Sequence, residues 1–344
     1  MIQTVLGEIA VEKLSYTLPH EHIFIDLRNL VSVPPDIKSN RIFYQKLSLE
    51  NLGYTLNNPY ALLDNAVIDD YEVMTYELIK YKEAGGVSIV DVTLRDIARD
   101  PHRLKNLSQR TGVNIIAGCG YYTAGSHPDS LSVTSIEDIA QEFFYELKKG
   151  MDDTDIKAGV IGEIGTSSQI TENEWKSVKA AGLVNLQTGA GIHVHTSLWD
   201  TNGYAIVKCL KDLGVSGEKI CIDHIDVDLR YDYLTELCHS GVFIEFDNFG
   251  KEYYINGHER YYMKGRFAYD LERVQMICRL ISDGFINNIL VTNDICLKSL
   301  LHSFGGRGYD HVLTNILPMM EDLNMTSAQI DTILIRNPAQ FLDI

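Results

Sequence analysis

The sequence predicts a single-domain (β/α)8 TIM barrel, in which eight parallel strands alternate with helices. Eight short apolar or β-branched runs recur along the chain. Most are followed by apolar residues at helical spacing, as in IEDIAQEFFYELKKG (136–150) and DLERVQMICRLISDGF (270–285). Strands that alternate with helices form parallel βαβ units, and eight such units close into a barrel. A length of 344 residues is common for one such domain.

The eight predicted strands follow one another without a tandem repeat or a low-complexity tract. They lie within residues 16–26, 86–93, 114–122, 158–165, 191–197, 219–226, 241–248 and 288–295. We therefore expect residues 1–344 to form one domain.

Two connections are longer than the barrel requires. Residues 27–70 follow the first strand and read as an elaborated first βα loop, and residues 249–268 form a long loop after the seventh strand. Loops of this length in a compact domain are usually functional.

The composition limits the partners and the compartment. Lys and Arg number 30 against 47 Asp and Glu, which gives a net charge of −17 and argues against nucleic acid or an anionic membrane as a partner. The six cysteines show no CxxC pair or framework spacing, which fits a reducing cytoplasm. We see no signal peptide and no apolar run of about 18 residues, so we expect a cytoplasmic protein without a membrane span.

Polar residues interrupt the apolar strands, mostly near their carboxyl ends. Parallel barrel strands are buried on both faces, and barrel active sites form at the carboxyl ends. A single histidine there is usually satisfied by hydrogen bonds, and Asp294 could simply cap a helix. Coincidence on five strands at one end of a barrel is much less plausible. The residues are His20, His22, Glu163, His193, His195, His224 and Asp294.

The residue types favour two metal ions. Four imidazoles (His20, His22, His195 and His224) and two carboxylates (Glu163 and Asp294) are too many for one tetrahedral zinc. They suit two divalent metal ions about 3.5–4 Å apart, bridged by a carboxylate and a hydroxide. The many imidazoles favour zinc, for which manganese or cobalt could substitute.

The ordered motifs resemble those of the phosphotriesterase-like branch of the amidohydrolase superfamily, over nearly the whole chain. This branch includes the phosphotriesterase-homology proteins and the phospho-furanose lactonases. The motifs that carry the resemblance are HxH in PHEHIFID, EIGTS, HVHTS, IDH in CIDHID, TND in VTNDI, and GGRGYDH (305–311).

The resemblance implies a role for each polar residue. His20, His22 and Asp294 would bind the more buried metal, His195 and His224 the more exposed one, and Glu163 would bridge them. The family pattern assigns no ligand role to His193, which reads equally well as a support for the ligands or as part of the core. Asp294 would also be the catalytic proton acceptor.

Two positions depart from the phosphotriesterases proper. Their proton relay uses a histidine after the seventh strand and an aspartate after the histidine of the sixth, where this sequence has Asn248 and Val227. This lowers the expectation of triester hydrolysis.

The resemblance also suggests a substrate. Lactone hydrolysis by a metal-bridging hydroxide is the usual activity of this branch. Tyr122 matches a lactonase tyrosine, and Lys251 in FGKEYY matches a lysine that binds sugar phosphate. Lys298 and Arg307 could complete an anion site. The leading expectation is a lactonase for a 5-phosphorylated aldono-1,4-lactone; homodimers are common among such proteins.

Three alternatives stay open. One is an acyl-homoserine lactonase or promiscuous phosphotriesterase with the same metal site and a more apolar pocket. Another is a mononuclear amidohydrolase such as a deaminase, against which Glu163 and both downstream histidines count. A third is a metal-stabilised binding protein without turnover.

Overall fold

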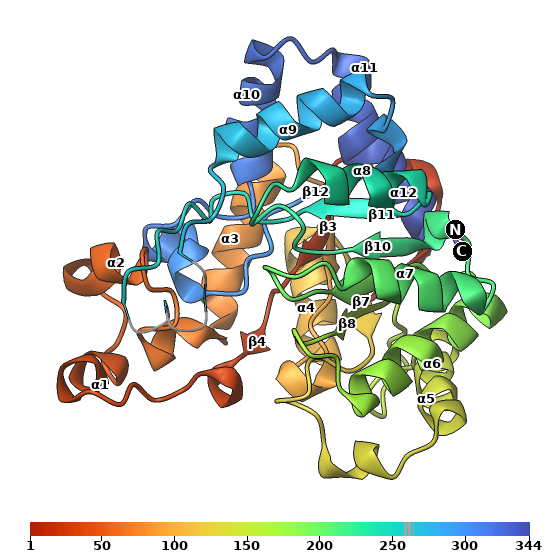
Figure 1. Ribbon diagram of the computed structural model, residues 1–344, viewed down its shortest axis with the longest axis horizontal. Helices are drawn as coiled ribbons and strands as arrows, with labels where there is room; N and C mark the ends of the chain where they lie inside the picture. Colours follow the sequence, from red (N-terminus) through yellow and green to blue (C-terminus); the bar gives the residue numbers. More distant parts are fainter. Residues whose placement is uncertain (258–259, 261–262, 264) are drawn as a thin grey trace.

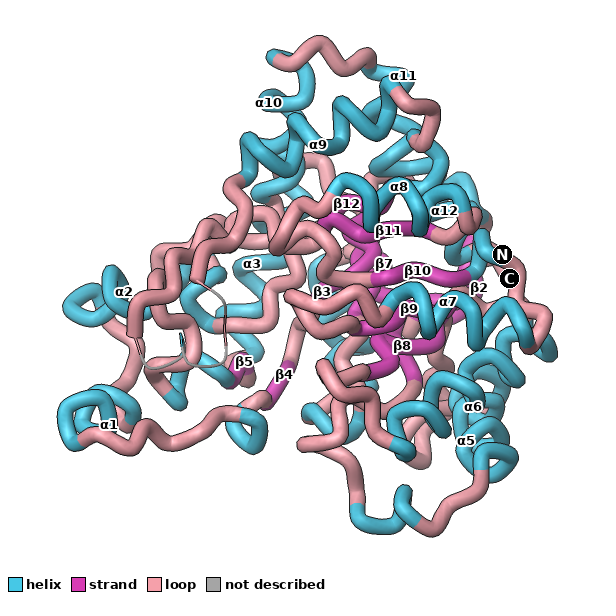
Figure 2. Tube along the Cα trace, in the orientation of Figure 1, coloured by secondary structure: helices cyan, strands magenta, loops and turns pink. Residues whose placement is uncertain are grey.

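The computed structural model describes residues 1–257, 260, 263 and 265–344. Eight parallel strands form one sheet that curls into a barrel, in the order β3-β6-β7-β8-β9-β10-β11-β12 (Figures 1 and 2). Each lies within one predicted range, so the barrel prediction is confirmed. The strands are β3 (Thr17–Glu21), β6 (Ser88–Asp91), β7 (Asn114–Cys119), β8 (Val160–Gly165), β9 (Ile192–His195), β10 (Ile220–Ile222), β11 (Phe243–Phe246) and β12 (Ile289–Val291).

A helix packs outside the barrel after each of the first seven barrel strands, and two further helices, described below, precede the first of them. Local signals set their ends: Asp100 caps α4 ahead of Pro101, and Gly112 ends it with a φ of 69°. Thr171 and Glu174 form a capping box at the start of α6. The helices are α3 (Tyr71–Glu83), α4 (Pro101–Thr111), α5 (Ile136–Lys148), α6 (Glu172–Thr188), α7 (Gly203–Asp212), α8 (Tyr231–His239) and α9 (Asp270–Ser282).

The C-terminal region is helical and returns to the base of the barrel. It comprises the π-helical segments Val312–Ile316 and Thr332–Arg336 and the helices α10 (Leu317–Asp322), α11 (Ser327–Asp331) and α12 (Asn337–Leu342). The two chain ends lie side by side (Figure 1), where the Met1 ammonium pairs with Asp343. No helix in the described residues has the length and apolar character needed to cross a membrane.

An apolar plug fills the amino-terminal end of the barrel. Ile2 lies in a hairpin that the sequence did not predict, β1 (Ile2–Thr4) and β2 (Gly7–Ile9). It packs with Val90, Phe243 and Phe341 in one buried cluster. Glu245 lies two residues beyond Phe243 in β11, and Asp247 lies four residues beyond it, so all three side chains point to the same side. Both carboxylates are fully buried. Polarity therefore rises along the barrel axis towards the carboxyl ends.

Glu21 joins the first barrel strand to the last. In the described residues β12 and β3 share no backbone ladder. Instead Glu21 Oε1 accepts from the Thr292 hydroxyl at 2.6 Å and the Asn293 N–H at 2.8 Å, and Oε2 accepts from the Ile295 N–H at 2.7 Å. A buried carboxylate therefore takes the place of backbone pairing at this seam.

The two long connections meet at the carboxyl-terminal end of the barrel. The first contains β4 (Ile25–Asp26), β5 (Val67–Ile68), α1 (Ile37–Phe43) and α2 (Leu49–Thr55), so it is more ordered than predicted. It reaches the connection after β11 through Asn58, whose amide donates to Asn256 Oδ1 at 2.9 Å. Part of the predicted 249–268 loop, residues 258–259, 261–262 and 264, lies outside the described residues.

Replacing Glu21 with Gln tests the seam. The amide would set an N–H₂ group against at least one of the buried donors, so we expect the free energy of unfolding to fall by about 2–4 kcal/mol. Chemical denaturation measures this against the surface variant Glu12→Gln. An unfolding midpoint equal to that of the control would show that Glu21 does not hold the barrel closed.

Candidate metal centre

The predicted ligands lie at the carboxyl ends of five barrel strands. His20 is in β3, Glu163 in β8, and His195 ends β9. His224 and Asp294 had been expected on their strands, but each lies two or three residues beyond the strand end, with left-handed φ values of 61° and 49°. Such values are uncommon for non-glycine residues and cluster at functional sites.

Four side chains form the inner group. His22 Nε2 lies 3.1 Å from Glu163 Oε1 and 3.2 Å from Asp294 Oδ1. His20 Nε2 lies 3.6 Å from Glu163 Oε2 and 3.9 Å from Asp294 Oδ1. All four side chains are buried. These are the residues predicted for the more buried metal.

Glu163 also belongs to an outer group. His195 Nδ1 and His224 Nε2 lie 3.0 and 3.4 Å from Glu163 Oε2 and 2.7 Å from each other. Two ring nitrogens and a carboxylate oxygen thus converge on one point. Glu163 makes the shorter contacts between the two groups, and Asp294 Oδ2 lies 3.9 Å from His224 Nδ1. The bridging role of Glu163 that the resemblance implies stays a prediction.

The carboxylates and imidazoles of the centre shift each other's pKa values, so that the carboxylates stay negatively charged and attract cations. Burial alone would raise the pKa of Glu163, but the imidazoles around it, His20 first, hold it well below its usual range. Burial would lower the pKa of His22, yet Asp294 and Glu163 raise it to about 9. Burial and the neighbouring His224 lower the pKa of His195. Carboxylates in these positions require cations beside them.

The side chains could hold divalent metal ions. Among the described residues, His20 Nε2 and Asp294 Oδ1 find no hydrogen-bond partner, although both atoms are buried and face the centre. Buried polar atoms of this kind are rare unless an ion or water satisfies them. Separate sets of ligand atoms, His20-His22-Glu163, His20-His224-Asp294 and Glu163-His195-His224, each lie within 4.8 Å of one another. Imidazole and carboxylate donors of this kind suit zinc.

A second layer of polar residues supports the ligands, and sequence reasoning did not single it out. His22 Nδ1 lies 2.9 Å from the Thr93 hydroxyl, and His224 Nδ1 lies 3.0 Å from Asp247 Oδ2. The signal was available in GVFIEFDN, where charged residues interrupt an apolar strand.

A cavity of about 390 Å³ opens from the metal centre. Its inner part is polar and includes five of the six predicted ligands, His20 being the exception, together with Asn248, Lys251 and Tyr122. The Tyr122 hydroxyl lies 3.3 Å from His195 Nδ1, beside the outer group. The remaining wall is largely apolar and includes Leu27, Leu30, Val31, Leu198, Met263 and Phe267.

The structure separates the three predicted anion-binding residues. Lys251 lines the cavity, is 4% exposed, and its ammonium contacts Asp294 Oδ2. Lys298 pairs instead with Asp64 at 3.0 Å, and the half-exposed Arg307 lies 3.5 Å from Glu252. Neither of these two lines the cavity.

Two departures from the phosphotriesterase pattern can also be placed. The Asn248 amide donates to Asp226 and Asp247 at 2.6 Å each, so it stabilises a buried carboxylate pair. Val227 is buried in the hydrophobic core. Neither side chain can relay a proton.

Comparisons with known proteins point to one family. A model of the Phosphotriesterase family matches residues 1–342. The N-acetyltaurine hydrolase of Xenopus tropicalis is 33% identical over 346 residues, covering 99% of this chain and 97% of that protein. A phosphotriesterase-related protein of Nematostella vectensis is 33% identical over 349 residues, covering 99% and 98%.

Solved structures show the same architecture. A resiniferatoxin-binding protein from Rhodobacter sphaeroides superposes with a TM-score of 0.95 at 31% identity, covering 99% of this chain and 94% of that chain. The phosphotriesterase homology protein from Escherichia coli, complexed with phosphate in its active site, superposes with a TM-score of 0.79 at 29% identity, covering 96% and 99%.

Replacing His22 with Asn should remove metal while the barrel still folds. The imidazole contacts both Glu163 and Asp294, and an amide is a much weaker zinc ligand. We expect metal content to fall by about one ion per chain, measured by elemental analysis. The exposed His102→Asn variant is the control. Full metal content in the His22 variant would contradict the assignment.

Metal binding should release protons at neutral pH. The raised pKa of His22, about 9, means that this imidazole is protonated below that pH in the absence of metal. A metal must displace this proton, so apparent affinity should fall up to about tenfold per pH unit for each displaced proton as the pH drops below 9. Calorimetry of zinc binding in buffers of different ionisation enthalpy counts the protons. An enthalpy that is independent of the buffer would contradict this expectation.

Proposed function

Because this chain belongs to the phosphotriesterase family, we propose that it is a two-metal hydrolase that cleaves the amide bond of a small N-acyl compound carrying one anionic group. Relatives that match along nearly their full length are named N-acetyltaurine hydrolases, and acetyltaurine is an amide with a single sulfonate. Zinc remains the metal we favour, and the inner and outer groups described above would hold the two ions.

The position of Lys251 carries the proposal. It is the one ammonium or guanidinium group among the described residues that line the cavity, and it lies in the polar part beside the centre. An ammonium has three donors, so contact with Asp294 leaves two for a substrate anion. A single cation suits a sulfonate or carboxylate better than a phosphate dianion.

The apolar wall would receive the acyl group. Leu27, Leu30 and Val31 come from the first long connection, while Met263 and Phe267 come from the connection after β11. Pockets of several hundred Å³ with apolar walls and a few polar groups bury most of a small ligand. The cavity therefore has room for acyl groups longer than acetyl.

The residues of the centre divide the chemical work. Two divalent ions, when bound, supply an activated water and polarise the carbonyl. Burial alone would raise the pKa of Asp294, but Lys251 and the inner histidines hold it below its usual range, so its carboxylate starts ionised. Asp294 then accepts the water's proton and passes it to the leaving nitrogen. The Tyr122 hydroxyl, beside His195, donates to the developing oxyanion.

Lactone hydrolysis is the second candidate, because the same groups would attack an ester carbonyl. The apolar wall favours an acyl-homoserine lactone over the 5-phosphorylated aldonolactone expected from the sequence. The phosphorylated substrate was expected to meet three cations, and Lys298 and Arg307 lie away from the cavity.

A substrate panel with the zinc-loaded protein tests the proposal. It contains N-acetyltaurine, N-acyltaurines of increasing chain length, an acyl-homoserine lactone, a 5-phosphoaldonolactone and a phosphotriester. We expect the N-acyltaurines to be cleaved with the highest kcat/KM, measured by release of taurine. A clear preference for either lactone would overturn the amide assignment and keep the hydrolase.

The variant Lys251→Met should weaken binding of anionic substrates specifically. A hydrogen bond to a charged group contributes about 1.5–3 kcal/mol, so we expect KM to rise about 10–100-fold for an acyltaurine. The KM for a neutral N-acylamide should rise much less. Metal content is measured in parallel, because Lys251 contacts Asp294.

The matched control is Lys298→Met, another lysine paired with an aspartate but outside the cavity. It should leave KM unchanged. Equal losses in the two lysine variants, or equal losses for charged and neutral substrates in Lys251→Met, would rule out Lys251 as the anion-binding group.

A further inference from the structure

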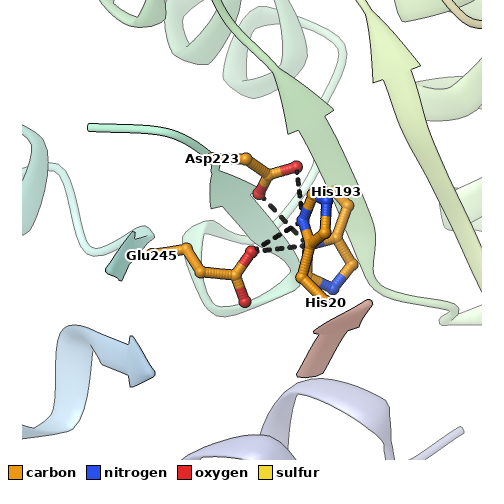
Figure 3. Close-up of side chains that lie close together, drawn as sticks. All are labelled: His20, His193, Asp223 and Glu245. Carbon is orange, nitrogen blue, oxygen red and sulfur yellow. Dashed lines mark hydrogen bonds and ion pairs between the residues drawn. The ribbon is translucent and has the colours of Figure 1, made fainter. Parts of the chain in front are cut away.

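Four buried side chains, His20, His193, Asp223 and Glu245, lie close together in the barrel (Figure 3). Each is fully buried, and none lines the cavity. They come from strands β3, β9 and β11 and from the residue that follows β10. We refer to these four residues as the barrel quartet. Their arrangement bears on the metal centre proposed above, and the inference below rests on that proposal.

The quartet is a ring of short contacts between two imidazoles and two carboxylates. His20 Nδ1 lies 3.0 Å from Glu245 Oε2 and 3.5 Å from Asp223 Oδ2. His193 Nδ1 lies 3.1 Å from Asp223 Oδ1 and 3.5 Å from Glu245 Oε2. Both carboxylates thus face both rings, and each ring uses its Nδ1 atom.

The two ring nitrogens of His20 contact different groups of residues. Nε2 faces Glu163 and Asp294 in the metal centre, whereas Nδ1 faces the quartet carboxylates. A neutral imidazole carries one N–H, and the nitrogen that carries it cannot also bind a metal. A carboxylate at Nδ1 fixes the proton there and leaves Nε2 as the free donor.

His193 supports the same arrangement from the far side. Its ring packs edge-on against Phe341 of α12, with centroids 4.8 Å apart. Phe341, which belongs to the apolar plug, therefore positions the His193 ring. His193 in turn contacts both carboxylates of the quartet, as His20 does.

We propose that Glu245 and Asp223 position His20 for the inner metal ion by accepting its Nδ1–H, and that His193 holds these two carboxylates in place. Glu245 and Asp223 are then positioning residues, because they act on the metal through His20. A third metal ion inside the quartet is the competing reading, since all four side chains are potential ligands. It would require His20 to bind metal through both nitrogens and to lose its second ring proton.

The first test is the metal affinity of Glu245→Gln, measured with competing chelators and without substrate. Loss of an outer-shell carboxylate typically weakens metal binding about 10–100-fold. We expect a loss of this size for one of the two ions. Asp223→Asn should act in the same direction but less strongly, because its oxygen is 3.5 Å from His20 rather than 3.0 Å. Glu12→Gln is the surface control.

A double-mutant cycle shows whether the effect passes through His20. In a His20→Asn background, Glu245→Gln should cause at most about a twofold further loss of inner-metal affinity. Asp247→Asn is the matched variant for the outer ion, because Asp247 contacts His224 in the same way. It should retain its full effect in the His20→Asn background. An equal loss from Glu245→Gln with and without His20 would overturn the proposal, and so would no loss at all.

Nitrogen-15 NMR of the zinc-loaded, histidine-labelled protein gives a second readout that needs no change at Glu245. The His20 signals are identified by their absence in His20→Asn. We expect Nδ1 to carry a proton and Nε2 to be metal-bound. A metal-bound Nδ1, or a third metal ion per chain that Glu245→Gln removes, would overturn the proposal. Because none of these measurements uses a substrate, failure of the amide assignment would be seen separately, in the substrate panel.

Discussion

Buried carboxylates at the carboxyl ends of the strands must be compensated by positive charge, and the organisation of this barrel depends on that constraint. Glu163 is the centre of it, because its two oxygens face four imidazoles from three other strands or strand ends. In an apolar barrel such a carboxylate would be strongly destabilising alone. The histidines that surround Glu163 stabilise its ionised form, which makes it a candidate metal ligand.

The same constraint explains the layers along the barrel axis. Apolar side chains such as Val90 and Phe243 fill the amino-terminal end, then the barrel quartet follows, then the metal ligands, and finally the cavity. Each layer contacts the next: Phe341 of the plug packs against His193, Asp223 and Glu245 contact both His193 and His20, and His20 faces the metal centre. Ligand orientation is therefore set by packing that begins far from any substrate, which is how rigid sites hold their geometry.

The cavity combines a polar and an apolar region. Among the described residues that line it, Lys251 places a buried ammonium beside the predicted metal ligands, and an apolar wall lies beyond them. Proteins similar to this chain are named for different substrates or ligands, N-acetyltaurine in one case and resiniferatoxin in another. A similar barrel therefore does not by itself decide the substrate.

The sequence by itself predicted the strand rhythm, which the structure confirms, and six candidate metal ligands, which the structure brings together. Both are encoded locally: buried parallel strands need continuous apolar runs, and a histidine or carboxylate near the end of such a run is visible without knowing its neighbours. Only the tertiary structure decided that Lys251 reaches the cavity while Lys298 and Arg307 turn to Asp64 and Glu252. It also decided that Glu21 closes the barrel and that Glu245 faces His20. The direction of a loop side chain, and the partner of a buried carboxylate, depend on residues hundreds of positions away in the chain, which local patterns do not encode.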